Sequence, residues 1–152
     1  MDELDAKILQ ALQNQFPLAE KPYDVLAQKL QITPDELWNR IERMINGGLI
    51  RRIGVSIDSG KIGFNSTLAA VSVPAGEVEK ASDIIAAFGE VTHSYLRNSE
   101  FNIWFTIIAA DEKRIEDILK QIQIKLSLKD LQVLNLPAKR FFKLDARFNI
   151  SS

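Results

Sequence analysis

Residues 91–110, VTHSYLRNSEFNIWFTIIAA, predict two strands joined by a short connection, and this pair decides the fold of the second half of the chain. Val91–Arg97 is rich in β-prone residues, Asn98–Ser99 favours a turn, and Phe101–Ala109 alternates apolar side chains with others. Strands joined this directly pair antiparallel with each other. The stretch therefore predicts a β-hairpin, with the flanking segments arranged around it.

The faces of the two strands differ, because side chains in a strand point alternately to opposite sides. The first strand places on one face the residues Val91, His93, Tyr95 and Arg97. An imidazole, a phenol and a guanidinium side by side are more typical of a site than of a core. In the second strand, the face of Trp104 is the less apolar one. Trp104 is therefore equally suited to stacking on a flat ligand and to packing at a dimer interface.

The segments around the hairpin complete a βαββαβ order. A strand is predicted at about 64–73, a helix at Glu77–Phe88, an amphipathic helix at Asp111–Leu126 and a mostly extended segment from Leu131 to about Phe148. This order is the ferredoxin-like pattern.

The first part of the chain predicts three short helices. Apolar residues recur at helical spacing in DELDAKILQALQ and in PYDVLAQKL, where Pro22 suits a first helical position. A third helix is predicted in PDELWNRIERMIN, with Thr33 as N-cap and Glu36 completing a capping box. The β-prone segment LIRRIGVSID follows and predicts a wing. Three helices and a wing outline a winged helix-turn-helix.

Together these patterns predict an α+β protein of two domains, an N-terminal winged helix-turn-helix at 1–60 and a ferredoxin-like βαββαβ domain at 61–152. The chain is 46% apolar and 26% charged, as globular proteins are. It has no cysteine, which excludes disulfides and thiolate chemistry. No segment approaches the roughly 20 apolar residues of a membrane span, and the acidic start does not resemble a secretory signal. We therefore expect a cytoplasmic protein that does not associate with membranes.

The helix-turn-helix raises the question of DNA binding. Its third helix would supply the base contacts, yet it carries Asp35, Glu36 and Glu42 against Arg40 and Arg43. Phosphate neutralisation supplies most of the affinity for DNA, and the whole chain has 19 basic and 20 acidic residues. The charge balance favours a helical module kept for packing or dimerisation over one that binds DNA.

Two further segments gather cations. Arg51 and Arg52 lie in the predicted wing, where adjacent side chains point to opposite faces, so at most one would reach a given site. If the tail LPAKRFFKLDARF is a strand, Lys139, Lys143 and Arg147 share one mostly cationic face. That face suits a polyanionic ligand, and it suits a solvated outer surface equally well.

His93 is the only histidine of the chain. Because histidine titrates near neutral pH, one role for it is general acid, and another is axial ligand to a metal in a macrocycle. A hydrogen-bonded structural role is the third. No spacing of histidines or carboxylates indicates a metal held by the protein alone, and no glycine-rich phosphate loop is present.

Four segments together resemble the siroheme decarboxylase family of the Lrp/AsnC-like group: FPLAEKPY, GLIRRIG, GEVTHSYLRNSEFNIWFTI and VLNLPAKRFFKLDARF. The resemblance spans nearly the whole chain, and the His-Tyr-Arg strand with the Asn-x-Trp-Phe strand is its most specific part. It implies the two predicted domains and a carboxy-lyase activity in haem biosynthesis. In that reaction siroheme loses the carboxyl groups of two acetate arms and becomes 12,18-didecarboxysiroheme.

The resemblance also implies roles for individual residues. His93 would deliver or position the proton that replaces carbon dioxide, or ligate the siroheme iron, while Tyr95 and Trp104 would line the ring. The carboxylate arms would be held by cations, namely Arg97, Lys139, Lys143 and Arg147, with Arg51 or Arg52 reaching in from the wing. Arginine suits this use because it pairs with carboxylates in bidentate geometry. The pyrrole ring can delocalise the electrons left by carbon dioxide, so no added cofactor is required.

The chain departs from the family in one segment. Many members carry a further histidine after the RRIG motif, whereas VSIDSGKIGF has none. Either a heterodimer with a homologous subunit would bring that histidine, or a homodimer would work with His93 alone. The alternative to an enzyme is an Lrp/AsnC-type transcriptional regulator that senses a small molecule or tetrapyrrole, and a third reading is a non-catalytic haem-binding subunit.

Overall fold

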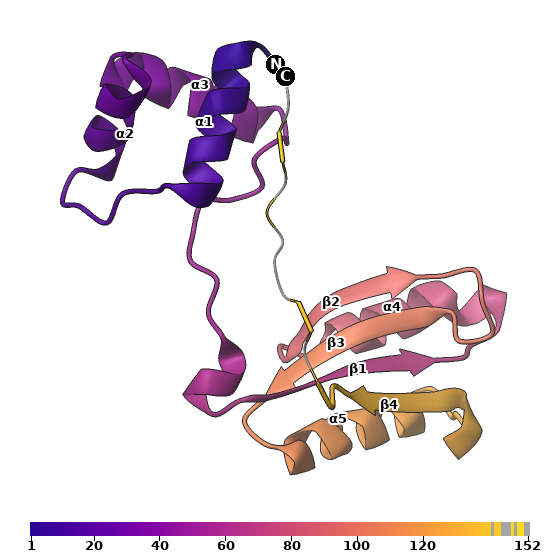
Figure 1. Cartoon of the computed structure of the whole chain (residues 1–152). Helices are drawn as coiled ribbons and strands as arrows, with labels where there is room; N and C mark the ends of the chain where they lie inside the picture. The colour runs from indigo at the N-terminus through magenta and orange to yellow at the C-terminus, as the bar shows by residue number, and fades with distance from the viewer. Residues whose placement is uncertain (141, 144–146, 148, 151–152) are drawn as a thin grey trace. The chain divides into compact units, whose positions relative to one another are not determined.

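The computed structural model describes residues 1–140, 142–143, 147 and 149–150, which fall into two compact units (Figure 1). The first unit comprises Met1–Val55 with the described residues from Lys143 onward, and the second runs from Ser56 to Phe142. The predicted domains at 1–60 and 61–152 follow the same order, while the compact units divide after Val55. Ile150 belongs to the first unit, where its backbone N–H donates to Oε1 of Gln10 at 3.2 Å.

Three helices form the first unit: α1 (Glu3–Asn14), α2 (Pro22–Leu30) and α3 (Pro34–Asn46). Their apolar faces meet in one core, whose members without exposed surface include Ile8, Leu26, Leu37 and Ile41. All three predicted helices are confirmed, and Pro22 occupies the start of α2 as its fixed backbone angle favours.

The start of α3 contains only half of the predicted capping box. Oγ1 of Thr33 accepts a hydrogen bond from the backbone N–H of Glu36 at 3.1 Å. The Glu36 side chain does not complete the box. Its Oε1 instead accepts a hydrogen bond from Nε of Arg40 at 3.2 Å. A complete capping box begins α1 instead, where Asp2 and Asp5 exchange side-chain and backbone hydrogen bonds.

The wing predicted in LIRRIGVSID does not form. Residues 51–58 belong to no strand, although Ile53, Val55 and Ile57 alternate as β-prone residues do in strands. A strand needs a neighbour to complete its backbone hydrogen bonds, and the one sheet of the described chain does not include this segment. The prediction was wrong because β-propensity alone does not supply a partner.

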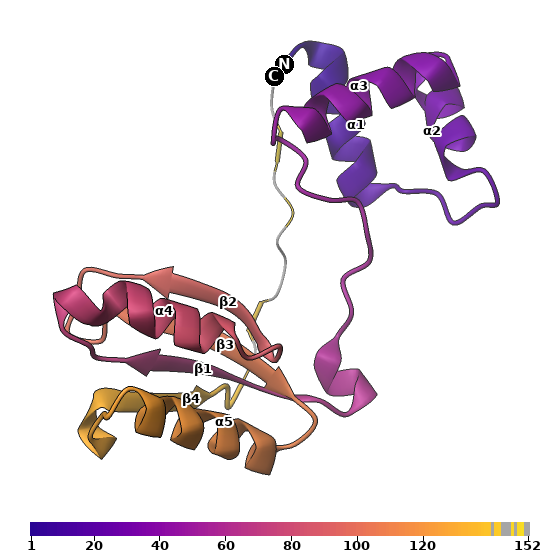
Figure 2. The ribbon, with the colours of Figure 1, turned by 180° about the vertical axis from the view of Figure 1, so that it is seen from behind.

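The second unit is a four-stranded antiparallel sheet in the order β2-β3-β1-β4. Its elements follow the predicted βαββαβ order: β1 (Asn65–Val71), α4 (Val78–Ala86), β2 (Val91–Leu96), β3 (Ile103–Ala109), α5 (Glu112–Lys125) and β4 (Val133–Pro137). The ferredoxin-like pattern is confirmed. Figures 1 and 2 show α4 and α5 on the same side of the sheet. We call the other side, which no described helix of this unit covers, the open face.

The core of the second unit lies between the helices and the sheet. Phe105 of β3, Ile85 of α4 and Ile118 of α5 have no exposed surface. Asp111 caps α5 by accepting a hydrogen bond from the backbone N–H of Arg114 at 2.7 Å, which places the start of this helix where its apolar period predicts. The amphipathic pattern of residues 111–126 is therefore confirmed.

The last strand is shorter than predicted. β4 ends at Pro137, and Lys139, Lys143 and Arg147 lie outside any strand. Their predicted common face is therefore not formed as a strand in the described part of the tail. Proline has no N–H for the ladder, which suits the end of an edge strand. Five more residues of the predicted strand lie outside the described residues, namely Phe141, Leu144, Asp145, Ala146 and Phe148.

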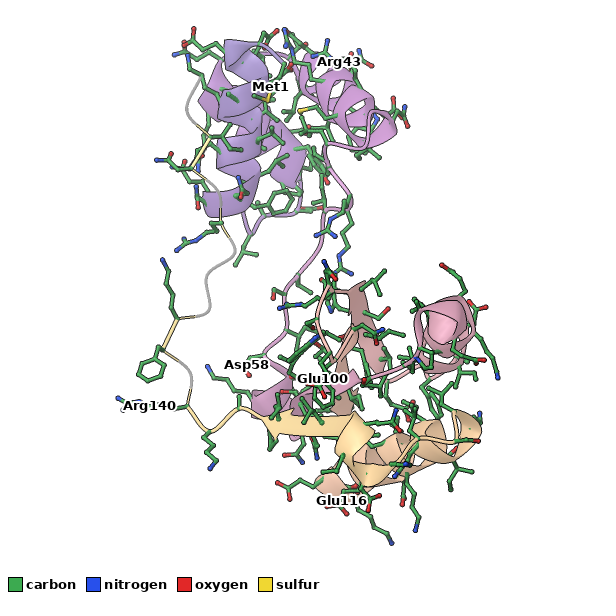
Figure 3. All side chains as sticks on the ribbon, turned by 90° about the vertical axis from the view of Figure 1, so that its right-hand side faces the viewer. Met1, Arg43, Asp58, Glu100, Glu116 and Arg140 are labelled. Carbon is green, nitrogen blue, oxygen red and sulfur yellow. The ribbon has the colours of Figure 1, made fainter. Side chains whose placement is uncertain are left out.

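A network of charged side chains joins α1 to α3 within the first unit. Asp5 is 2% exposed, and its carboxylate accepts hydrogen bonds from Nη1 of Arg40 at 2.9 Å and Nη2 of Arg43 at 2.8 Å. Nη1 of Arg40 also donates to Asp2 at 2.7 Å. Burial acts to raise the pKa of Asp5, but the backbone N–H of Asp2 and the two guanidinium groups outweigh it and lower the pKa. Both arginines of α3, including Arg43 labelled in Figure 3, are thus engaged by α1.

We expect Asp5→Asn to destabilise the first unit by roughly 2 kcal/mol, because it leaves two guanidinium groups without their buried partner. Urea unfolding followed by Trp38 fluorescence, in a Trp104→Phe background, reports on this unit. Glu3→Gln is the matched control, since it removes an exposed pair with Lys7 and should leave the midpoint unchanged. Equal midpoints for Asp5→Asn and its parent would contradict this role for the network.

The same network predicts a response to acid. The hydrogen bond from Arg40 lowers the pKa of the Asp2 carboxyl from 3.8 to about 2. A carboxyl with a lowered pKa stabilises the fold above its ordinary pKa and loses that effect as the pH falls through the folded value. The urea midpoint of the parent should therefore exceed that of Asp2→Asn near neutral pH, and the difference should shrink between about pH 4 and pH 2. A difference that does not change with pH would exclude this linkage.

Candidate functional site

The open face of the sheet carries two rows of side chains that cross all four strands. Cross-strand pairing gives the first row as Tyr95, Trp104, Ala70 and Leu134. It gives the second row as His93, Thr106, Leu68 and Leu136. Four strands spaced about 4.8 Å apart make a platform about 14 Å wide. The predicted alternation therefore brings His93, Tyr95 and Trp104 onto one aromatic and apolar surface.

A β-bulge in β2 orients His93. Val91 pairs with Ile107 on the helix-covered face, whereas His93 pairs with Thr106 on the open face, and the register shifts between them. The prediction that Val91 shares a face with His93 was wrong, because strict alternation does not hold across a bulge. His93 and Tyr95 do share the open face, where their ring centroids lie 6.4 Å apart with ring planes 12° from parallel.

Thr92, which alternation places on the opposite face, contacts the ring of His93. Nδ1 of His93 lies 3.0 Å from Oγ1 of Thr92, and this hydroxyl points at the carbonyl oxygen of Thr106 at 3.5 Å. A hydroxyl that donates to the carbonyl can accept the Nδ1–H of His93, so this contact favours the tautomer in which Nε2 is unprotonated. No pattern in the sequence signals this contact, because the bulge that creates it depends on pairing with β3.

Arg97 follows β2 and covers the indole of Trp104. Its guanidinium carbon lies 5.1 Å from the ring centroid, a cation–π contact. The backbone N–H of Arg97 donates to the carbonyl of Asn102 at 2.7 Å, and the indole N–H of Trp104 donates to the carbonyl of Phe101 at 2.8 Å. The turn end of the hairpin therefore brings two predicted site residues into contact, because the guanidinium of Arg97 lies over the indole ring of Trp104.

The other predicted cations lie elsewhere. Lys139 follows β4, so it lies at the opposite edge of the sheet from Arg97, and the antiparallel register places it at the opposite end as well. The remaining four belong to the first unit and are exposed: Arg51, Arg52, Lys143 and Arg147. Their part in the site stays a prediction.

Two hollows of the second unit contain none of the predicted site residues. One is lined by Pro74 and Leu128, and the other by Asn65 and Glu116. Among the described residues, no group of three or more His, Cys, Asp or Glu could hold a metal ion. The described helices include none that is both long enough and apolar enough to cross a membrane.

Each of the two parts of the chain matches a known protein family. Residues 5–51 match the siroheme decarboxylase NirDL-like HTH domain, and residues 61–143 match the AsnC-like ligand binding domain. The fold therefore defines a helix-turn-helix protein of the AsnC-like class. The crystal structure of an AsnC family transcriptional regulator from Agrobacterium tumefaciens has the same fold, with 24% identity, a TM-score of 0.77, and coverage of 98% of this chain and 97% of that chain.

More similar relatives share a narrower name. The siroheme decarboxylase alpha subunit of Nitratidesulfovibrio vulgaris is 36% identical over 99% of this chain and 84% of its own length. The siroheme decarboxylase NirG subunit of Stutzerimonas stutzeri is 31% identical over 99% of this chain and 100% of its own. The crystal structure of the siroheme decarboxylase NirDL aligns with 31% identity and a TM-score of 0.74, over 98% of this chain and 47% of that chain. The chain belongs to the siroheme decarboxylase family.

We expect Thr92→Val to change the tautomer of His93. In the parent, acceptance of the Nδ1–H by Thr92 favours an unprotonated Nε2, whereas the variant should revert toward the Nε2–H form that free imidazole prefers. Nitrogen-15 NMR at about pH 8.5 measures this directly, because the chain has one histidine. Thr92→Ser keeps the hydroxyl and should keep the tautomer, and identical spectra for Val and Ser variants would refute the contact.

Proposed function

We propose that the chain is a siroheme decarboxylase, or a subunit of one, that converts siroheme to 12,18-didecarboxysiroheme. The observation that carries the proposal is the composition of the open face. Two rows of mostly aromatic and apolar side chains include His93, and Arg97 lies at the edge of this face. Siroheme is a flat ring with carboxylate arms, so its ring suits Tyr95, Trp104 and the leucines, and its arms suit the cations.

A related structure supports this choice of ligand. The siroheme decarboxylase NirDL has been crystallised in co-complex with an iron-uroporphyrin III analogue. That protein is 32% identical to this chain, with a TM-score of 0.71 over 88% of this chain and 44% of that chain. A carboxylate-rich macrocycle is therefore the ligand class that a relative of the same fold binds.

The reaction requires an electron sink and a proton. When the bond between the acetate methylene carbon and its carboxyl carbon breaks, the electron pair passes into the pyrrole ring and carbon dioxide leaves. The methylene carbon then takes a proton and becomes a methyl group. In this proposal His93 supplies or positions the proton, and to supply it Nε2 must first be protonated. An unprotonated Nε2 suits the other role, axial ligand to the siroheme iron. Neither step needs an added cofactor, and the proposal includes none.

The cations are proposed to hold the carboxylate arms. Arg97 and Lys139 occupy opposite corners of a platform about 14 Å wide, so they cannot hold the same arm and would contact arms on opposite sides of the ring. Arg97 offers bidentate geometry and Lys139 a single charged donor. That Arg51 or Arg52, with Lys143 and Arg147, hold further carboxylate arms stays a prediction from the family resemblance.

Assembly from two homologous chains is part of the proposal. Relatives are named as alpha, NirD and NirG subunits, and the chain spans 44% of the siroheme decarboxylase NirDL subunit of Paracoccus pantotrophus. That protein has room for a second domain pair of the same length. A heterodimer would bring a second histidine, whereas a homodimer would rely on His93. The proposed location of either assembly is the cytoplasm.

The alternative function is an Lrp/AsnC-type transcriptional regulator that senses a tetrapyrrole. Its support is the fold, which AsnC family regulators share. The pairing of Arg40 and Arg43 with carboxylates of α1 argues against DNA binding by α3, because these guanidinium groups already form ion pairs within the protein. A gel shift with genomic fragments at low salt separates the two, since a regulator should shift them with a steep salt dependence.

The deciding experiment is anaerobic incubation of the purified chain with siroheme, followed by mass spectrometry of the tetrapyrrole. Loss of two carbon dioxide units would establish the activity and show that one type of chain suffices. Binding without mass loss would indicate that a homologous partner is required, and the mixture would then be assayed. Absence of binding would overturn the proposed function.

Two variants test the assigned residues in the same assay. His93→Gln should keep siroheme binding but lose about 100-fold or more in turnover, because the proton source is gone. Arg97→Ala should weaken binding about tenfold, because a charge-assisted contact to a carboxylate is lost. Lys120→Ala, an exposed change on α5, is the control for both. A loss for Arg97→Ala no larger than for this control would remove Arg97 from the site.

A further inference from the structure

Asn102 lies beyond the last regular pair of the β1–β3 ladder, which joins Val71 to Ile103. Its backbone N–H donates to the carbonyl of Val71 at 3.0 Å. Its side chain reaches further, since Oδ1 accepts from the N–H of Val73 at 3.1 Å and Nδ2 donates to the carbonyl of Val73 at 2.8 Å. An amide that makes both bonds to one residue copies the hydrogen-bonded pair of an antiparallel ladder. Asn102 thus extends the attachment of β3 to Val73, past the end of β1.

The two bonds require an asparagine. An aspartate of the same size has no donor and would place a carboxylate oxygen against the carbonyl of Val73, while a hydroxyl cannot provide a donor and an acceptor in this planar fork. Val73 is 7% exposed, which shelters the paired groups from competing water.

The same residue also holds the other strand of the hairpin. The carbonyl of Asn102 accepts a hydrogen bond from the backbone N–H of Arg97 at 2.7 Å, and the turn between these two residues contains Glu100, which Figure 3 labels. Two residues after Asn102, Trp104 presents the indole over which the guanidinium of Arg97 lies, 5.1 Å away. Asn102 is therefore bonded at once to the end of β1 and to the end of β2.

We propose that Asn102 is a positioning residue of the site, whose side-chain amide clamps the turn end of the β2–β3 hairpin to Val73 and so fixes Arg97 over Trp104. Without the clamp, the hairpin end can separate from β1, and Arg97 no longer has one preferred place at the edge of the open face. The part of this inference that concerns siroheme rests on the proposed function. The part that concerns the hairpin rests on contacts within the second unit alone.

The first test measures the hairpin without any ligand. In a Trp38→Phe background Trp104 is the only indole, because the chain has two tryptophans. Acrylamide quenching of Trp104 should increase in Asn102→Ala, since the guanidinium no longer covers the ring. Asn102→Asp keeps the volume and the acceptor but loses the donor, so it should show the same direction of change, and it serves where the alanine variant does not fold.

The second test measures binding and turnover of siroheme. Asn102→Ala should raise the Kd about tenfold, as Arg97→Ala does, because it acts through the same guanidinium. Turnover of bound siroheme should change by less than about twofold, since the bonds of the clamp do not include His93. The double variant should bind no more weakly than Arg97→Ala alone, because the two changes remove one interaction.

Asn135→Ala is the matched control for both tests. It removes another amide of the same sheet, the acceptor of a hydrogen bond from Oγ1 of Thr67 at 2.6 Å, and does not touch the hairpin. It should leave both the quenching of Trp104 and the Kd at the values of the parent. A change equal to that of Asn102→Ala would mean that general weakening of the sheet is the cause, and would overturn the inference.

The outcomes separate the inference from the proposed function. Unchanged quenching in both Asn102 variants overturns the clamp, and so does a double variant whose loss is the sum of the two single losses. If the parent binds no siroheme, the proposed function fails, and the quenching measurement alone decides whether Asn102 positions Arg97.

Discussion

The alternation of side chains along β3 is the constraint on which the second unit depends. β3 is hydrogen-bonded to β2 on one side and to β1 on the other, so its side chains cannot exchange faces. Ile103, Phe105 and Ile107 are thereby fixed beneath α4 and α5, where the exposed fraction of each is 2% or less. A slip of one residue would bury an indole and expose a phenylalanine. The apolar contacts that stabilise the sheet therefore also hold Trp104 outward.

The polar groups of the site lie where the sheet departs from regular pairing. A bulge turns His93 toward the open face and brings a hydroxyl to its Nδ1. At the turn that joins β2 to β3, the side-chain amide of Asn102 continues the backbone ladder between β1 and β3. Bulges and side-chain bonds of this kind re-aim individual side chains without disturbing the core on the opposite face. The regular part of the sheet provides the platform, and its two irregular ends orient the groups that would contact a ligand.

Much of the fold could be predicted because local patterns decide it. Helical spacing and capping residues locate α1 to α5, and the order of elements indicates the ferredoxin-like sheet. Alternation also correctly groups His93 with Tyr95 on one side of β2 and places Trp104 outside the core. What could not be predicted depends on a partner that local patterns do not contain. Val91 changes face because of its pairing with β3, and the expected wing has no neighbouring strand.

The same distinction holds for individual side chains. The spacing of Thr33 and Glu36 correctly predicts an N-cap, but not that Arg40 competes for the glutamate. The position of Asn102 in a strand pattern indicates only which way it points, and its bonds to Val73 emerge once the end of β1 is beside it. Charged and amide side chains are the least predictable from sequence, because several partners at similar distances compete for each one.

The ion pairs between α1 and α3 determine what the helix-turn-helix presents to an approaching molecule. Arg40 and Arg43 direct their charge toward Asp2 and Asp5, so the long-range potential of α3 is dominated by its exposed carboxylates Asp35 and Glu42. A polyanion that approaches α3 therefore meets no attractive field from this helix, whether it is a duplex or a tetrapyrrole with carboxylate arms. Electrostatic guidance of such a molecule would have to come from cations outside α3.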